Sequence, residues 1–169
     1  MSPEEFNWFV SKNIDLNVDK KTTWKIISAP GNLVNYHPFV KDNPTIKWPG
    51  LNSIDEIFYH NGLHYVRNFK FWSPNVGYDL IIGKRDSINK SFVSWRVHET
   101  GNGSSLTITI YPYIFNRSNK LLNYLPFMML VKPMLSRYLN AISQGLKNYV
   151  NTGMRVRKNQ FGSHPWFSN

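Results

Sequence analysis

The clearest pattern of apolar and polar positions lies toward the C-terminal end of the chain, in residues 133–152. Apolar side chains recur there every three or four residues, a spacing that forms one stripe along a helix. The stripe consists of Leu135, Tyr138, Leu139, Ile142, Leu146, Tyr149 and Val150. Gly153 follows at a position where helices commonly end. The pattern therefore predicts a helix of roughly 30 Å with this stripe buried in the core.

The segment before this helix, residues 121–131, is more apolar and contains Pro126, with Pro133 just beyond it. Helix can continue through Pro133, but the carbonyl of Met129 then loses its hydrogen bond and a kink is expected. Met128 and Val131 would stay on the apolar stripe. A long helix with one apolar face needs a large apolar surface to lie on.

The N-terminal part predicts one strand and two short helices. Alternation of apolar and polar residues indicates a strand between Phe6 and Asn17. Asp19 can cap a helix over residues 20–28, because its carboxylate can accept hydrogen bonds from backbone N–H groups two or three residues on. Residues 32–36 predict a further helical turn, which ends before Pro38.

Strand patterns dominate the middle of the chain. They lie at residues 45–48, 54–60, 63–72, 76–84, 92–98 and 106–115. Asn61-Gly62 is the strongest hairpin signal, and successive hairpins make an antiparallel meander. The predicted fold class is α+β: a curved antiparallel sheet of about seven strands wrapped around the long C-terminal helix, with two short helices after the first strand.

Length and composition fit one soluble domain. The chain has 169 residues, of which 41% are hydrophobic and 15% aromatic, enough for a real core. We expect residues 1–153 to form the domain and residues 154–169 a basic, aromatic tail. With no cysteine, disulfides and thiol catalysis are excluded. Neither a signal peptide nor an apolar run of ~20 residues is visible, which indicates a cytoplasmic location.

Three segments resemble the SRPBCC or START-like superfamily. Residues 14–24, ending on Trp24, are similar to the family's first strand and first helix. Residues 32–40 are similar to its second helix, where an aromatic residue shortly precedes a proline. Residues 138–150, which end in Gly145-Leu-Lys-Asn-Tyr-Val150, are similar to its final helix. The resemblance implies a helix-grip fold with an apolar pocket between sheet and helix. The proline-broken segment before the last helix and the tail after Gly153 depart from the family pattern.

That pocket defines the candidate ligand-binding residues. They are Tyr36, His37, Phe39, Tyr65, Arg67, Phe69, Tyr78, Leu80, Trp95, Ile108, Ile110, Met128, Tyr138 and Ile142. Arg67 falls on the more apolar face of residues 63–71, where a guanidinium can hold a carboxylate, phosphate or carbonyl. A local bulge would turn Arg67 outward instead, and the pattern leaves both orientations open.

No catalytic or metal-binding motif is present. The histidines lack metal-ligand spacing, and no Gly-x-Ser-x-Gly elbow occurs. The acids considered for the pocket, Glu56, Asp79 and Glu99, fit the outer sheet face equally well. We therefore predict no catalytic residue, metal or cofactor.

These features favour the binding of a small hydrophobic molecule, such as a lipid, quinone or polyketide-like compound, with transfer or presentation as its wider role. The alternative is an enzyme of the polyketide cyclase or dehydratase type that uses the same pocket. The superfamily contains both binders and enzymes, so the resemblance does not decide between them. A basic interaction module is a third class.

The charge distribution motivates that third class. The net charge is +10, and every acidic residue lies at or before Glu99. Lys132, Arg137 and Lys147 are the candidate membrane- or anion-binding residues. They accompany an apolar segment, residues 121–134, that would dock on anionic lipid with Trp166 and Phe167 as an interfacial anchor. Nucleic acid is the less favoured partner, and a solvated basic surface is the alternative explanation.

Overall fold

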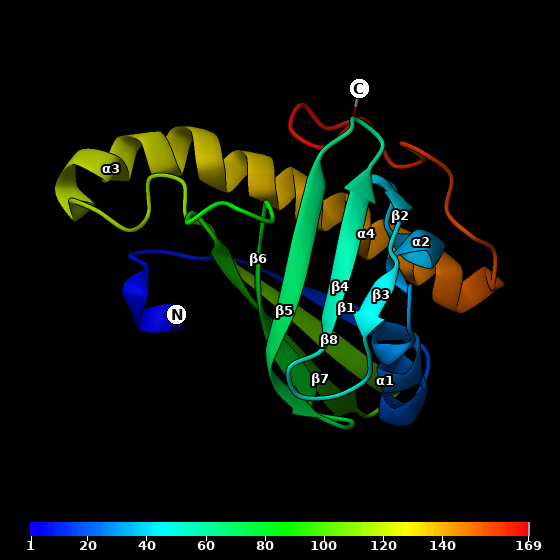
Figure 1. Ribbon diagram of the computed structural model, residues 1–169. Coiled ribbons are helices and arrows are strands. Elements are labelled where there is room, and N and C mark those ends of the chain that lie inside the picture. Colours follow the sequence, from blue (N-terminus) through cyan, green and yellow to red (C-terminus); the bar gives the residue numbers. More distant parts are fainter. Residues whose placement is uncertain (169) are drawn as a thin grey trace.

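A computed structural model describes residues 1–168 (Figure 1). After a short 3-10 turn at Pro3–Glu5, the elements are β1 Val10–Leu16, α1 Lys20–Ser28, α2 Leu33–Tyr36, β2 Val40–Asp42, β3 Thr45–Lys47, β4 Ile54–Tyr59, β5 His64–Ser73, β6 Gly77–Gly83, β7 Ser91–Thr100, β8 Gly103–Tyr111, α3 Lys120–Pro126, η2 Phe127–Val131 and α4 Lys132–Thr152.

The strands form one antiparallel sheet in the order β1-β8-β7-β6-β5-β4-β2, with β3 also paired to β4. The sheet curves, and α4 lies across it (Figure 1). The predicted fold class is confirmed. The sheet has eight strands rather than about seven, because β2 spans only three residues and gives no alternating signal.

Local signals correctly placed the helices. Helix α1 has the predicted bounds, and its Asp19 carboxylate accepts a 2.8 Å hydrogen bond from the Thr22 N–H. Helix α4 ends at Gly153, which is left-handed with φ 69°. Its predicted stripe is buried at Leu135, Leu139, Ile142 and Leu146.

The apolar segment before α4 is helical throughout. Helix α3, the π-helical turn η2 and α4 follow one another without a break. In η2 the N–H of Lys132 donates to the carbonyl of Phe127, five residues back. This wider turn lies directly before Pro133, which has no N–H to donate. Within the described residues, no helix is both long and apolar enough to cross a bilayer.

Helix α2 lies tightly against α4. A Cβ built on Gly145 would fall 2.0 Å from the carbonyl oxygen of Tyr36, so only glycine allows this approach. Helix α1 contacts β7 and β8. Helix α2 lies beside the C-terminal half of α4, and α1 lies below it, at the other end of the sheet (Figure 1).

Strand β5 departs from simple alternation. Its register against β6 shifts between Phe69 and Phe71, which marks a β-bulge at Lys70. Beyond the bulge the facing of the strand reverses. Phe71, predicted on the apolar face, is exposed, while Trp72 packs against Tyr78.

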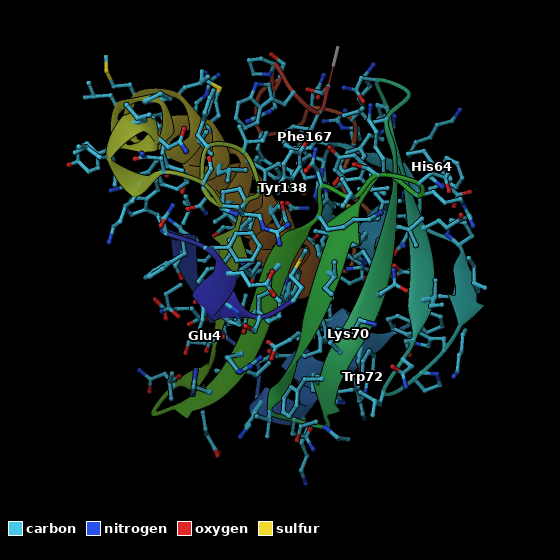
Figure 2. All side chains as sticks on the ribbon, turned by 60° about the vertical axis from the view of Figure 1, so that its left-hand side comes forward. Glu4, His64, Lys70, Trp72, Tyr138 and Phe167 are labelled. Atoms are coloured by element: carbon cyan, nitrogen blue, oxygen red, sulfur yellow. The ribbon has the colours of Figure 1, made fainter. Side chains whose placement is uncertain are left out.

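The segment after α4 folds back over the domain. Val156 N–H donates to the carbonyl of Asn35, and the Asn61 side chain donates to the carbonyl of Trp166. Phe167 is buried, with its ring 4.5 Å from that of Tyr138 (Figure 2). Phe167 therefore faces the core, which differs from the predicted interfacial anchor.

Candidate functional site

A cavity of about 400 Å³ lies between the sheet and α4. Its apolar wall comes from four sheet strands, β8 among them, and from the inward stripe of α4. The main apolar lining residues are Ile57, Leu80, Val93, Trp95, Ile108, Ile110, Leu135, Leu139 and Ile142. The cavity opens where lining residues become half-buried or exposed, at Tyr65, Lys84 and Tyr113. Its volume and lining suit a small apolar molecule.

Nine of the predicted ligand-binding residues line this cavity. They are His37, Tyr65, Arg67, Leu80, Trp95, Ile108, Ile110, Tyr138 and Ile142. The structure thus brings together residues from six elements or loops that lie up to about a hundred positions apart in the chain. Their contact with a ligand stays a prediction.

Five predicted residues lie outside the cavity wall. Phe69 and Tyr78 are fully buried in an aromatic cluster with Trp24 and Trp72. Tyr36 is buried where α2 meets α4, because Gly145 admits its backbone there. The other two fill space elsewhere: Phe39 packs on Tyr138 and His164, and Met128 is half-buried in η2. A side chain that faces the interior therefore does not always line the cavity.

The sequence pattern missed several lining residues. Tyr59 alternates with Ile57 on β4 and could have been found from that spacing. Trp166 and Phe167 line the cavity from the C-terminal segment. No local signal in the sequence indicates that this segment returns to the domain, because its position depends on contacts with residues far away in the chain.

A hydrogen-bonded chain of three side chains forms the polar end of the cavity. Nε2 of His37 lies 2.8 Å from the hydroxyl of Tyr138, which lies 3.4 Å from the hydroxyl of Tyr59. Nδ1 of His37 accepts from the Phe39 N–H at 3.3 Å. All three side chains line the cavity and are buried.

Burial keeps these three groups uncharged. It lowers the pKa of His37 to about 3, because the imidazolium would lose its hydration, and the nearby positive charge of Arg67 lowers it further. Burial raises the pKa of Tyr138 to about 12 and that of Tyr59 well above its usual value. At neutral pH the polar end therefore offers hydrogen-bond donors and acceptors without net charge.

Arg67 points inward and is already paired. Its Nε donates to Oδ1 of Asp55 at 2.7 Å, and its Nη2 donates to Oδ2 of the same carboxylate. Asn43 also donates to Oδ2 at 3.1 Å. Burial by itself would lower the pKa of Arg67, but attraction to the Asp55 carboxylate raises it. The pair leaves no net charge on this part of the wall.

The three acids predicted as candidates for the pocket lie outside the cavity wall. Asp79 pairs with Arg96 at 2.7 Å, Glu56 pairs with His64 and Arg85, and Glu99 is exposed. Asp55, the acid buried behind the wall, was not among those considered. Within residues 1–168, neither an Asp nor a Glu lines the cavity, and no group of three His, Asp or Glu side chains is placed to hold a metal ion.

No protein family model matches the chain, and no curated protein matches it. Several solved structures do. SSP2350 from Staphylococcus saprophyticus superposes with a TM-score of 0.62 at 13% identity, over 89% of this chain and 97% of that one. Ara h 8.0201 superposes with a TM-score of 0.61 at 10% identity, over 86% of this chain and 98% of that one. DynU16, from the dynemicin biosynthetic locus, superposes with a TM-score of 0.63 at 10% identity. The match covers 89% of this chain and 51% of DynU16. At these identities the likeness establishes the fold alone: the chain has the helix-grip fold.

Proposed function

We propose that the protein binds a small hydrophobic molecule in the cavity between the sheet and α4. The observation that carries this proposal is the cavity of about 400 Å³ with its wall of Leu80, Ile108, Leu139 and other apolar side chains. Each 100 Å² of apolar ligand surface that leaves water contributes about 2.5 kcal/mol before the cost of ordering the ligand. A lipid, quinone or polyketide-like compound meets this description, and transfer or presentation of the bound molecule is the wider role.

The cyclase or dehydratase alternative requires a group that moves protons at the ligand. His37 is the imidazole on the cavity wall, and its pKa of about 3 makes it a weak base at neutral pH. Asp55, which is hydrogen-bonded to the lining residue Arg67, is also held by Asn43. Both observations favour binding over catalysis.

A neutral, polarity-sensitive fluorescent dye is expected to bind the folded protein at one site and to be displaced by fatty acids, quinones or flat polyphenols. Ile108→Trp fills the cavity and should weaken dye binding at least tenfold. Fluorescence titration measures the dissociation constant, and circular dichroism checks that the fold survives.

The matched control is Thr109→Trp, because Thr109 lies on the same strand with its side chain on the opposite face, where it contacts Ser11. This variant should bind the dye as the unchanged protein does. Equal affinity in both variants, or dye binding that appears only in partly unfolded protein, would refute a cavity site.

A second candidate function, reversible docking on anionic membranes, is favoured by the exposed surface of α3 and η2. This part of the long helix projects beyond the sheet (Figure 1). The apolar side chains that it exposes are Leu121, Leu122, Tyr124, Leu125, Met129 and Leu130, with Leu121 85% and Met129 76% exposed. Lys132, Arg137 and Lys147 follow on α4 and are exposed. Apolar insertion combined with basic charge is the usual pair of signals for membrane binding.

Liposome co-sedimentation tests this docking. Binding should require anionic lipid and weaken as salt screens the charges. Changing Lys132, Arg137 and Lys147 to Gln should lower the partition coefficient by up to about 100-fold, since each basic group near the surface contributes ~1 kcal/mol.

The control replaces Lys20, Lys21 and Lys25 of α1 with Gln, which removes the same charge from a helix at the opposite end of the molecule from α3 (Figure 1). It should bind membranes almost as the unchanged protein does. Equal losses in the two triple variants would mean that net charge alone attracts the protein, and equally poor sedimentation with neutral and anionic vesicles would rule membrane docking out.

A further inference from the structure

We infer that the molecule bound in the cavity carries a neutral hydrogen-bond acceptor, such as a ketone or ether oxygen, that receives a hydroxyl hydrogen from Tyr59 or Tyr138. This inference rests on the proposed binding function and specifies its ligand. It follows from the number of hydrogens in the polar chain formed by His37, Tyr138 and Tyr59.

The hydrogen positions in this chain are constrained at one end. Because Nδ1 of His37 accepts from the Phe39 N–H, the imidazole hydrogen is on Nε2. That hydrogen points to the hydroxyl oxygen of Tyr138, 2.8 Å away. Tyr138 is therefore an acceptor toward His37 and keeps its own hydrogen for another partner.

The two hydroxyl groups share one further contact. Tyr59 and Tyr138 are 3.4 Å apart, and one hydrogen suffices for that bond. The three side chains thus carry three polar hydrogens, but only two hydrogen bonds join them. Whichever tyrosine donates to the other, one hydroxyl hydrogen has no acceptor within the chain.

The unused hydrogen belongs to a side chain that lines the cavity, because both tyrosines do. Both are also buried, with Tyr59 only 2% exposed. A buried donor without an acceptor is costly, so a ligand that supplies an acceptor here gains affinity over one that does not. The geometry selects for a ligand with an oxygen within reach of these hydroxyl groups.

The charges around the chain favour a neutral oxygen over a carboxylate. Arg67, the nearest cation, is already held by both oxygens of Asp55. His37 is neutral above about pH 3 because its burial lowers its pKa. Lys84 also lines the cavity, but it is exposed at the opening. An anionic group brought to the buried end would lose its hydration without gaining a free cation.

The test compares two ligands of the same shape, 2-acetylnaphthalene and 2-isopropenylnaphthalene, in which the carbonyl of the first is replaced by C=CH2. Calorimetric or fluorescence titration gives both affinities, and infrared spectroscopy of 13C-carbonyl ketone reports its hydrogen bond directly. We expect the bound carbonyl band at lower frequency than in hexane. The ratio of ketone to olefin affinity should fall about tenfold in a variant that lacks the chain.

That variant is His37→Phe/Tyr59→Phe/Tyr138→Phe, because removing either tyrosine alone leaves another donor facing the cavity. If this variant binds the olefin as the unchanged protein does, it is folded. If the variant does not fold, the infrared measurement on the unchanged protein tests the hydrogen bond to the ketone by itself. Binding of both ligands with a hexane-like carbonyl band, or tighter binding of 2-naphthoate than of the ketone, overturns the inference while the binding function stands. If neither naphthalene binds, the proposed function fails for ligands of this size and the inference fails with it.

Discussion

Asp55→Asn is expected to lower the free energy of unfolding by about 3–5 kcal/mol. Asp55 is fully buried and Arg67 is only 3% exposed. The asparagine keeps the shape of the side chain but removes the charge, so the guanidinium is left in the protein interior without its counter-ion. Urea denaturation followed by circular dichroism measures the loss.

Two comparisons separate this effect from general disruption. Asp55→Leu combined with Arg67→Met removes both charges and should be much less destabilising than Asp55→Asn alone. Asp79→Asn breaks a pair with the partly exposed Arg96 and should cost about 1 kcal/mol or less. A loss for Asp55→Asn no greater than that for Asp79→Asn would show that the buried pair is not important for folding.

Leu146→Ala should destabilise the protein by about 2–5 kcal/mol. Leu146 is fully buried on the α4 stripe. The loss combines the transfer free energy of the removed carbons with the cavity that remains. Thermal and urea denaturation both report it.

Lys147→Ala is the matched control, because Lys147 is the next residue along the helix and is exposed. Its effect should stay within about 0.5 kcal/mol. An unchanged melting temperature for Leu146→Ala would contradict the burial of α4 against the rest of the domain.

The parts of this fold that were predictable from sequence depend on local signals. The α4 stripe, the Asp19 cap and the Asn61-Gly62 turn each act over a few residues, so they can be read without knowing the rest of the structure. Alternation along β8 likewise placed Ile108 and Ile110 on the inner face.

The parts that were not predictable depend on distant partners. The bulge at Lys70 arises from how β5 pairs with β6, and it reverses the facing of Phe71 and Trp72. The inward orientation of Arg67 depends on Asp55, which lies opposite it on the neighbouring strand. The closing of the cavity by Phe167 requires the chain to return over more than a dozen residues after α4.

The residues that line the cavity were likewise only partly predictable from local signals. Alternation identified inward-facing side chains, but the inner face has two regions. Toward α1, Tyr78 and Phe69 are buried and packed together with Trp24 and Trp72. Toward the C-terminal segment, Leu80, Ile108 and Ile142 surround open volume. Which region a residue joins is decided by what covers it, which no strand pattern encodes.

The most direct test of ligand binding in this cavity is a nuclear magnetic resonance experiment on protein labelled at its Ile, Leu and Val methyl groups and titrated with 2-acetylnaphthalene. Saturable binding at one site should give intermolecular nuclear Overhauser effects from the naphthalene ring to methyl groups of Leu80, Ile108, Leu139 and Ile142. Effects confined to the exposed Leu121 and Leu125 of α3, or no saturable shifts at all, would contradict ligand binding between the sheet and α4.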